Sequence, residues 1–400
     1  YTGDDGDIVD ISAQDYTDTG LWESVGSARL TMQDYSNTDL WRQVNLGESP
    51  IDVQAYVLDS SIKADGSLTV RAVSEQRIDA IVISGAVAAS AGSTGVSVSG
   101  AGVGAMNLIS ASVMSYIDGD GESTYGGIEA GSITLEADDT STINAITGAA
   151  TLAAGFGSTG VAVSMSVALA HNGISNDVSA FMTRADDGVT ATAGAVTVSA
   201  SEASDISTIT TAASVSVGIG STGVAVSGAG AAATNAILTK TNAFIEDSTV
   251  TTLAPTGNLT VSAEDRSTID ATVAAVAASA AGGGTGVGVA IGASYAGNMI
   301  GYDLLLGAVP IKDPAEVKAF VDNSTISAAG DILITATAEE TILSQIAAGA
   351  VAIAAGGTGV GVGGSGVVAI NMLSTDINAF IDNASDVTGS SVSLSANDTS

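Results

Sequence analysis

The sequence predicts an all-β protein built from a long repeat, and three observations lead to this fold class. A Thr-Gly pair recurs five times, an asparagine follows each of those glycines twelve positions later, and apolar residues alternate with small ones along the chain. A fixed offset kept through several copies is typical of a repeat array, and an apolar period of two is typical of strands. The repeat anchors are Gly95, Gly160, Gly223, Gly286 and Gly359, with Asn107, Asn172, Asn235, Asn298 and Asn371.

One complete copy runs from Asn258 to Gly330. Residues 259–263 alternate as a strand does, and the polar residues 264–267 are expected to form a bend. A Val-, Ala- and Thr-rich run over 269–281 then ends at a glycine turn, and the copy closes with Ala319–Ile326. A helix is disfavoured because β-branched residues dominate and each glycine costs a helix about 1 kcal/mol relative to alanine.

The strand that follows the glycine turn has two unequal faces. Val287, Val289 and Ile291 carry branched side chains on one face, whereas the residues between them are Gly and Ala. We expect the small face to be buried against another layer, either within the chain or between chains; alternatively, it only fills a narrow solenoid interior. The repeated asparagine is expected either to adopt a left-handed turn or to form an internal amide ladder.

Two domains are expected, a Tyr- and Trp-containing short-repeat segment over residues 1–50 and the array over 51–400. The anchors lie 65, 63, 63 and 73 positions apart, and an insert at about 301–314 explains the longest spacing. The two tryptophans lie 19 positions apart, and 63 divides into three rungs of 21, so three β-solenoid rungs per repeat are predicted. Because Val392–Ala396 resembles the opening of a copy, we expect the chain to be a segment of a longer polypeptide.

The composition excludes several functions. Ten basic and 43 acidic residues give a formal net charge of -33, which argues against nucleic acid and against docking on anionic membranes. The uncharged run 81–117 has a strand period and contains Ser, Gly and Asn, and both properties disfavour a transmembrane helix. Aromatic residues make up only 4% of the chain, which disfavours membrane-spanning strands. No membrane insertion is expected.

Few residues could carry chemistry. Asp118, Asp120 and Glu122 are predicted calcium ligands because they occupy alternate positions of a loop, although Ser123 replaces the glycine expected at its sixth position; the alternative is a solvated acidic loop. The only histidine, His171, lies in a slot that other copies fill with unrelated residues, so we expect a loop there and no catalytic triad. No catalytic residue and no cofactor other than calcium are predicted.

The repeated Ala-Phe-Ile-Asp-Asn and Leu-Thr-Val-Ser-Ala motifs, at Ala379–Asn383 and Leu259–Ala263, resemble those of giant repetitive bacterial surface and secreted proteins, the filamentous-haemagglutinin-like adhesins. The resemblance covers nearly the whole chain and implies a right-handed parallel β-helix, export, and adhesion or extracellular structure. The long Gly/Ala-rich strand pair around each Thr-Gly departs from that pattern and leaves stacked antiparallel hairpins, or a projecting hairpin, as alternatives.

The predicted function is an extracellular or cell-surface structural protein that self-associates into a filament, sheath or surface fibre, without catalysis. The alternative is an adhesin module that binds carbohydrate or another surface through an aromatic ladder of Tyr16, Trp22, Tyr35 and Trp41. A third possibility is an enzyme carried on a β-helix, which the scarcity of basic residues disfavours.

Overall fold

The computed structural model describes residues 50–121, 127–303, 310–383 and 386–400, and all regular structure in these ranges is β. Each repeat forms one coil, which consists of a long outgoing strand, a tight turn, a long returning strand and a short strand. The coil of β6 (Ser132–Phe156), β7 (Thr159–Thr183) and β8 (Val189–Ala191) is typical. Among the described residues, no helix has the length and apolarity needed to cross a membrane.

The other coils repeat this order. The remaining strands are β1 (Ile51–Leu58), β2 (Ile62–Lys63), β3 (Ser67–Ala91), β4 (Thr94–Asp118), β5 (Ile128–Ala130), β9 (Val196–Ile219), β10 (Thr222–Glu246), β11 (Thr249–Thr252), β12 (Leu259–Ile300), β13 (Tyr302–Asp303), β14 (Ile311–Lys312), β15 (Ala315–Asp322), β16 (Thr325–Ala328), β17 (Ile332–Ala338), β18 (Thr341–Leu373), β19 (Thr375–Asp382), β20 (Asp386–Thr388) and β21 (Val392–Asp398).

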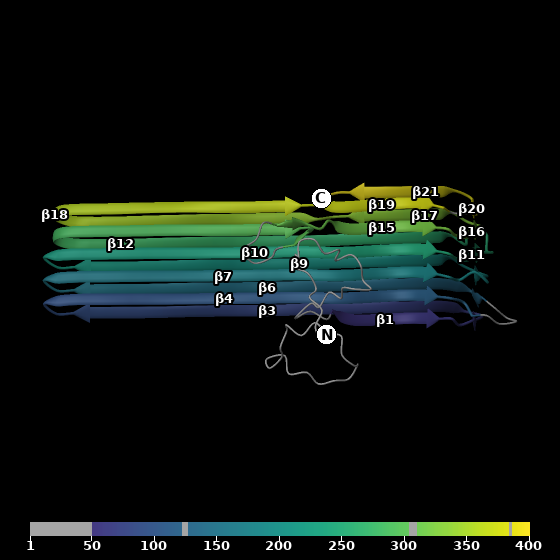
Figure 1. Cartoon of the computed structure of the whole chain (residues 1–400), viewed down its shortest axis with the longest axis horizontal. Helices are drawn as coiled ribbons and strands as arrows, with labels where there is room; N and C mark the ends of the chain where they lie inside the picture. Colours follow the sequence, from purple (N-terminus) through teal and green to yellow (C-terminus); the bar gives the residue numbers. More distant parts are fainter. Residues whose placement is uncertain (1–49, 122–126, 304–309, 384–385) are drawn as a thin grey trace, which may run out of the picture. The chain divides into compact units, whose positions relative to one another are not determined.

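Neighbouring coils pair in parallel, as in a parallel β-helix (Figure 1). The long strands β3 and β4 do not pair with each other, because β3 pairs with β6 and β4 pairs with β7. The chain therefore passes from one sheet face to the other at each Thr-Gly turn. Stacked antiparallel hairpins, the alternative from the sequence, are wrong for these strands.

The register shows that one repeat makes one coil. Gly160 pairs with Gly223 and Asn172 with Asn235, so the offset between paired residues is the whole repeat. The predicted division into three rungs of 21 residues is therefore wrong. The long strands explain the difference, since a single 25-residue strand on each side uses most of the repeat.

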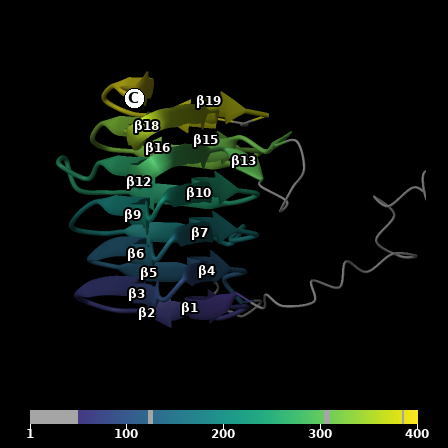
Figure 2. The same cartoon turned by 90° about the vertical axis from the view of Figure 1, so that its left-hand side faces the viewer.

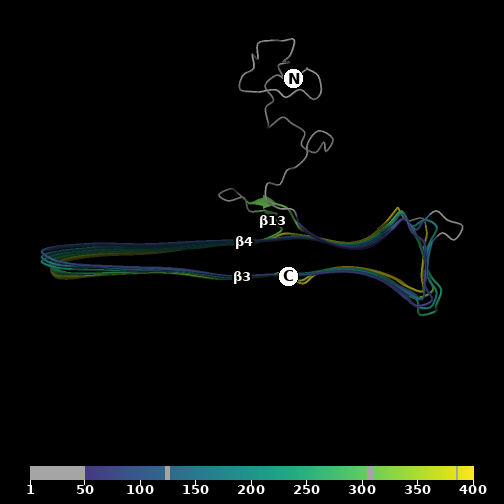
Figure 3. The same cartoon turned by 90° about the horizontal axis from the view of Figure 1, so that it is seen from below.

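Figure 2 shows the coils stacked one above another from β1 to β19, and the view along the stack in Figure 3 shows that each coil has two parts. We call the wider, three-sided end the base; its third side is the sheet β2-β5-β8-β11-β16-β20. We call the long, thin part the arm; it consists of two sheets that face each other and meet at the Thr-Gly turns. The successive arms superimpose closely in Figure 3, so the arm sheets have little twist.

The base has an ordinary apolar core. Its interior is filled by branched residues that repeat from coil to coil, such as Leu135, Val198, Val261 and Ile334. On the outside of the base, one aromatic ring per coil stacks on the next, with ring centroids 4.8–5.0 Å apart. The stacked rings are Tyr56, Tyr116, Phe181, Phe244, Phe320 and Phe380.

The arm has an interior of small residues. Ala168, Ala231 and Ala275 are buried between the two sheets, together with serines that hydrogen-bond across the layer, such as Ser227 to Ser214. Space is tight at the turns: a Cβ added to Gly223 would lie 2.5 Å from the Gly218 carbonyl oxygen. The small face is buried, and the layer that covers it is the opposite sheet of the same coils, so the small residues also line a narrow interior, which was the alternative considered from the sequence.

The repeated asparagine forms an amide ladder inside the arm. Asn107, Asn172 and Asn235 each donate through Nδ2 to Oδ1 of the asparagine in the next coil, at 2.8 Å, and Asn298 continues to Asn371 at 2.9 Å. Their backbone is extended strand. Of the two roles considered from the sequence, the internal ladder is confirmed and the left-handed turn is wrong.

The left-handed positions lie instead at a corner of the base. Three residues after the stacked ring, Arg184, Asp247 and Asn323 have φ values of 54°, 47° and 42°. The expected bend at residues 264–267 is also absent, because β12 continues through them with Asp265 and Ser267 pointing inward. In the insert, β13 and β14 form a separate antiparallel pair outside the stack, as Figure 3 shows for β13.

The amide ladder gives a stability test. Asn235→Ala would leave the amide hydrogen of Asn172 and the carbonyl oxygen of Asn298 without their buried partners, which costs about 1–3 kcal/mol. We expect a clear fall in the urea midpoint, with the far-ultraviolet circular dichroism of the native state unchanged. The matched control is Asn144→Ala, which removes only an exposed bond to Asp79; equal effects of the two substitutions would contradict the ladder's contribution.

Candidate functional site

The outer surface of the arm is unusually apolar. Because the small residues point inward, the branched residues of the same strands point outward, and Ile81, Val87 and Val98 are 69%, 76% and 67% exposed. The pattern recurs in the following coils, for example at Met165 and Ile291. Large contiguous apolar surfaces mark interaction sites in soluble proteins, so the arm is the first candidate functional surface.

The second candidate is a row of buried carboxyl groups where the arm joins the base. Asp139, Glu202 and Asp265 are equivalent residues of consecutive coils, and in the next coil Glu340 follows two positions after Ala338, the pairing partner of Asp265. All four are almost completely buried. We call this set the acid layer.

Hydroxyl and amide groups surround the acid layer. Asn176, from the opposite sheet, donates to Asp139 Oδ2 at 2.9 Å and to Glu202 Oε1 at 3.2 Å. Ser267 and Thr239 donate to Asp265 at 2.6 and 2.5 Å. Asp139 Oδ1, Glu202 Oε2 and Glu340 Oε1 have no hydrogen-bond partner within the described ranges.

Burial without a basic partner favours the neutral acids. It raises the pKa of Glu202 well above its usual value, with the Asp139 and Asp265 carboxylates adding to the effect. Burial likewise raises the pKa of Asp265, and raises that of Glu340 to about 7. No group of three or more metal-ligating side chains occurs in the part of the chain that the structure describes. The raised pKa values favour the neutral forms of Glu202, Asp265 and Glu340.

The bend predicted at Glu264–Ser267 concealed the acid layer, because a bend would leave Asp265 in solvent, whereas strand β12 continues through these residues. A signal was present: each of Asp139, Glu202 and Asp265 lies at the inward position of an alternating strand and has a serine two residues later. Strand parity therefore predicts their burial once the strand is extended through the polar residues.

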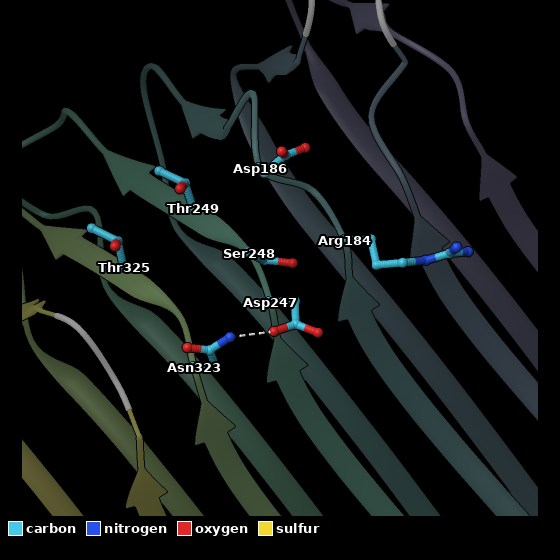
Figure 4. Close-up of a pocket in the computed structure, with 7 residues that line it drawn as sticks. All are labelled: Arg184, Asp186, Asp247, Ser248, Thr249, Asn323 and Thr325. Carbon is cyan, nitrogen blue, oxygen red and sulfur yellow. Dashed lines mark hydrogen bonds between the residues drawn. The ribbon is translucent and has the colours of Figure 1, made fainter.

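The base carries shallow polar clefts along its left-handed corner (Figure 4). Arg184, Asp247 and Asn323 lie there on successive coils, and Asn323 Nδ2 donates to Asp247 Oδ1 at 2.5 Å. The adjacent cleft is lined by Asp59, Asp120, Arg184, Asp186 and Asp187, with Gly119 and Gly121. These clefts are open and polar, and of the predicted calcium residues Asp120 lines the second cleft.

Two of the predicted calcium ligands already have protein partners. Arg184 Nε donates to Asp118 Oδ1 at 2.7 Å, and the backbone N–H of Gly188 donates to Asp120 Oδ2 at 2.7 Å. Burial raises the pKa of Asp120. Glu122 lies outside the described residues, so the calcium site stays a prediction.

The other candidate residues from the sequence either lie outside the described residues or lie in a different element from the one expected. Tyr16, Trp22, Tyr35 and Trp41 lie outside the described residues. His171 is in strand β7 rather than in the expected loop, and its Nδ1 lies 2.8 Å from Thr234 Oγ1. Partial burial lowers the pKa of His171.

Comparison with known proteins adds no assignment. No protein-family model, no curated protein and no solved structure matches this chain.

The acid layer predicts a pH-dependent stability. A carboxyl group whose pKa is higher in the folded than in the unfolded state stabilises the fold most at low pH. Its contribution is complete below the pKa of the unfolded state, about 4.5 for Glu, and is lost as the pH rises through the pKa of the folded state. We expect the urea midpoint to fall between pH 4.5 and pH 7.5. Glu202→Gln should flatten this dependence, whereas Glu264→Gln, on the outward face, should leave it unchanged.

The calcium prediction has its own test. If Asp118 and Asp120 bind calcium, millimolar Ca²⁺ should raise the melting temperature and Asp120→Asn should remove that rise, because the substitution keeps the side chain's shape and removes its charge. Isothermal titration calorimetry measures the binding directly. If Asp59→Asn, across the same cleft, removed the rise in melting temperature equally, calcium would be acting by unspecific screening of the acidic surface.

Proposed function

We propose that this chain is a structural segment of an extracellular or cell-surface fibre, filament or sheath, that it associates with itself, and that it carries no active site. In this proposal the fold is a right-handed β-solenoid, as in the filamentous-haemagglutinin-like adhesins that the repeat motifs resemble. The supporting observation is the continuity of equivalent residues along the stack: backbone ladders, stacked rings and the amide ladder all run from coil to coil.

Such continuity suits a structural role for a physical reason. In a stack, each coil contacts its neighbours only, so stability grows with the number of coils and an extended object can form without a large globular core. The stacked rings and amides strengthen the contact between coils. The two clefts described on the base are open and lined mostly by polar residues.

The alternative, a carbohydrate-binding adhesin, gains no support from the rings on the base. A sugar stacks on the face of an aromatic ring, but Phe181 and Phe244 have both faces covered by the rings of neighbouring coils, and their planes are nearly parallel. These rings therefore strengthen the stack. The aromatic residues that the adhesin hypothesis invoked are those of residues 1–50.

Electron microscopy and fibre diffraction of the purified 400-residue chain test the proposal. We expect fibres whose diffraction has a reflection at about 4.8 Å along the fibre axis, since parallel strands stacked along that axis repeat at this distance. Isolated particles that bind glycan arrays tightly would instead support the adhesin module. Particles that neither assemble nor bind glycans would contradict both functions.

A further inference from the structure

Within the acid layer, Asp139 and Glu202 differ from Asp265 in how their oxygens are partnered. Asp265 accepts a hydrogen bond at each oxygen, from Ser267 at Oδ1 and from Thr239 at Oδ2. Asp139 and Glu202 each accept hydrogen bonds at one oxygen, whereas Asp139 Oδ1 and Glu202 Oε2 have no partner among the described residues. Two consecutive coils therefore each hold one bare carboxyl oxygen in the interior.

A single amide group holds these two carboxyl groups beside each other. Asn176 Nδ2 donates to Asp139 Oδ2 at 2.9 Å and to Glu202 Oε1 at 3.2 Å. Ser141 also donates to Asp139 Oδ2, at 2.7 Å, and Ser204 donates to Glu202 Oε1. All of these donors bind the same oxygen of each carboxyl group, so the other oxygen is left without a donor in both coils.

The pair is enclosed and has no positive charge beside it. Asp139 and Glu202 are 2% and 1% exposed, and the side chains that donate to them are buried as well. These donors are neutral amide and hydroxyl groups. In the described ranges, the salt bridges of the basic residues are made to other carboxylates. Burying two ionised carboxylates in this way is unfavourable unless a counter-charge accompanies them.

We propose that Asp139 and Glu202 bind one calcium ion inside the stack, through Asp139 Oδ1 and Glu202 Oε2, between two consecutive coils. This site is separate from the calcium loop predicted at Asp118 and Asp120, which lies at the corner of the base. The proposal does not depend on the proposed structural function, because an ion between two coils stabilises the fold whether or not chains associate.

Charge and spacing favour calcium among the common cations. Two ionised carboxylates are balanced by one divalent ion, but not by one proton or one monovalent ion. The coils that hold Asp139 and Glu202 also hold Phe181 and Phe244, whose ring centroids are 4.8 Å apart. An ion midway between oxygens at that separation would lie about 2.4 Å from each, within the roughly 2.3–2.6 Å of calcium and beyond the roughly 2.0–2.1 Å of magnesium.

Hydroxyl groups are the further ligands that the protein offers to this ion. The part of the chain that the structure describes holds no group of three or more metal-ligating acids or histidines, so the site has two carboxylates only. Ser141 and Ser204 each donate a hydroxyl hydrogen to a carboxyl oxygen, and each hydroxyl oxygen retains a lone pair. Because calcium binds neutral oxygens together with carboxylates, both hydroxyl groups suit it.

The enclosure of the site determines how the ion would behave. It would enter as the coils form and would then resist a chelator added to the native chain, unlike an ion bound at the corner of the base. Calcium and the proton would also compete for the same carboxyl groups. The fall in urea midpoint with rising pH that we expect from the acid layer therefore applies to the calcium-free chain.

Metal analysis of the refolded 400-residue chain tests the proposal. The chain is unfolded in urea with EDTA, refolded at about pH 7.5 with or without millimolar Ca²⁺, and dialysed in its native state against EDTA. After refolding with Ca²⁺, inductively coupled plasma mass spectrometry should find about one calcium per chain, which urea unfolding should release. The urea midpoint should be higher for the calcium-loaded chain than for the calcium-free chain.

Three variants locate the ion. Glu202→Gln and Asp139→Asn each remove one charged ligand and keep the size of the side chain, and each should lower the retained calcium at least about tenfold. The matched control is Asp265→Asn, a buried acid of the same row whose two oxygens already have donors, and it should retain the ion.

Several results would overturn the inference. They are a refolded chain that retains no calcium, retention of sodium or magnesium in its place, and equal retention by Glu202→Gln and Asp265→Asn. Loss of the retained ion in Asp120→Asn would place it at the corner of the base instead. The comparison of the unsubstituted chain refolded with and without Ca²⁺ decides the question even if a variant fails to fold, which far-ultraviolet circular dichroism would reveal.

Discussion

Parallel stacking of equivalent residues is the constraint on which the rest of the structure depends. Each side chain lies beside its counterpart in the next coil, at about the strand spacing of 4.8 Å. A residue type that can interact with itself is therefore favoured at a repeated position. Phenylalanine does so by ring stacking and asparagine by donating and accepting an amide hydrogen bond, and both form continuous ladders here.

In the acid layer, stacking of equivalent residues is unfavourable. Carboxylates stacked on carboxylates repel each other, and among the described residues the hydrogen-bond partners of Asp139, Glu202 and Asp265 are hydroxyl and amide groups rather than basic side chains. The structure accommodates them through surrounding hydroxyl and amide donors and through raised pKa values of Glu202 and Asp265. The layer is flanked by the apolar core of the base on one side and by buried isoleucines such as Ile143 and Ile174 on the other.

The base and the arm of each coil differ in which residues they bury and which they expose. The base holds the bulky core and most of the charged surface, and it resembles an ordinary globular interior. The arm reverses the usual arrangement, with Ala, Ser and Gly inside and Val, Ile and Met outside. Its sheets approach closely because their inner faces lack bulk, and the displaced apolar side chains become the outer surface. The apolar outer surface of the arm therefore follows from the narrowness of the arm interior.

The sequence by itself determined the strands, the repeat boundaries and the buried small face, because a period of two and a fixed glycine-to-asparagine offset are local properties. It also limited Asn172 and its equivalents to two roles. Tertiary structure alone decided that one repeat makes one coil, that the strands around Thr-Gly belong to different sheets, and that Asp265 points inward. The physical reason is that paired residues of neighbouring coils lie 60 or more positions apart in the chain, so neither the register nor the direction of a side chain can be inferred from neighbouring residues.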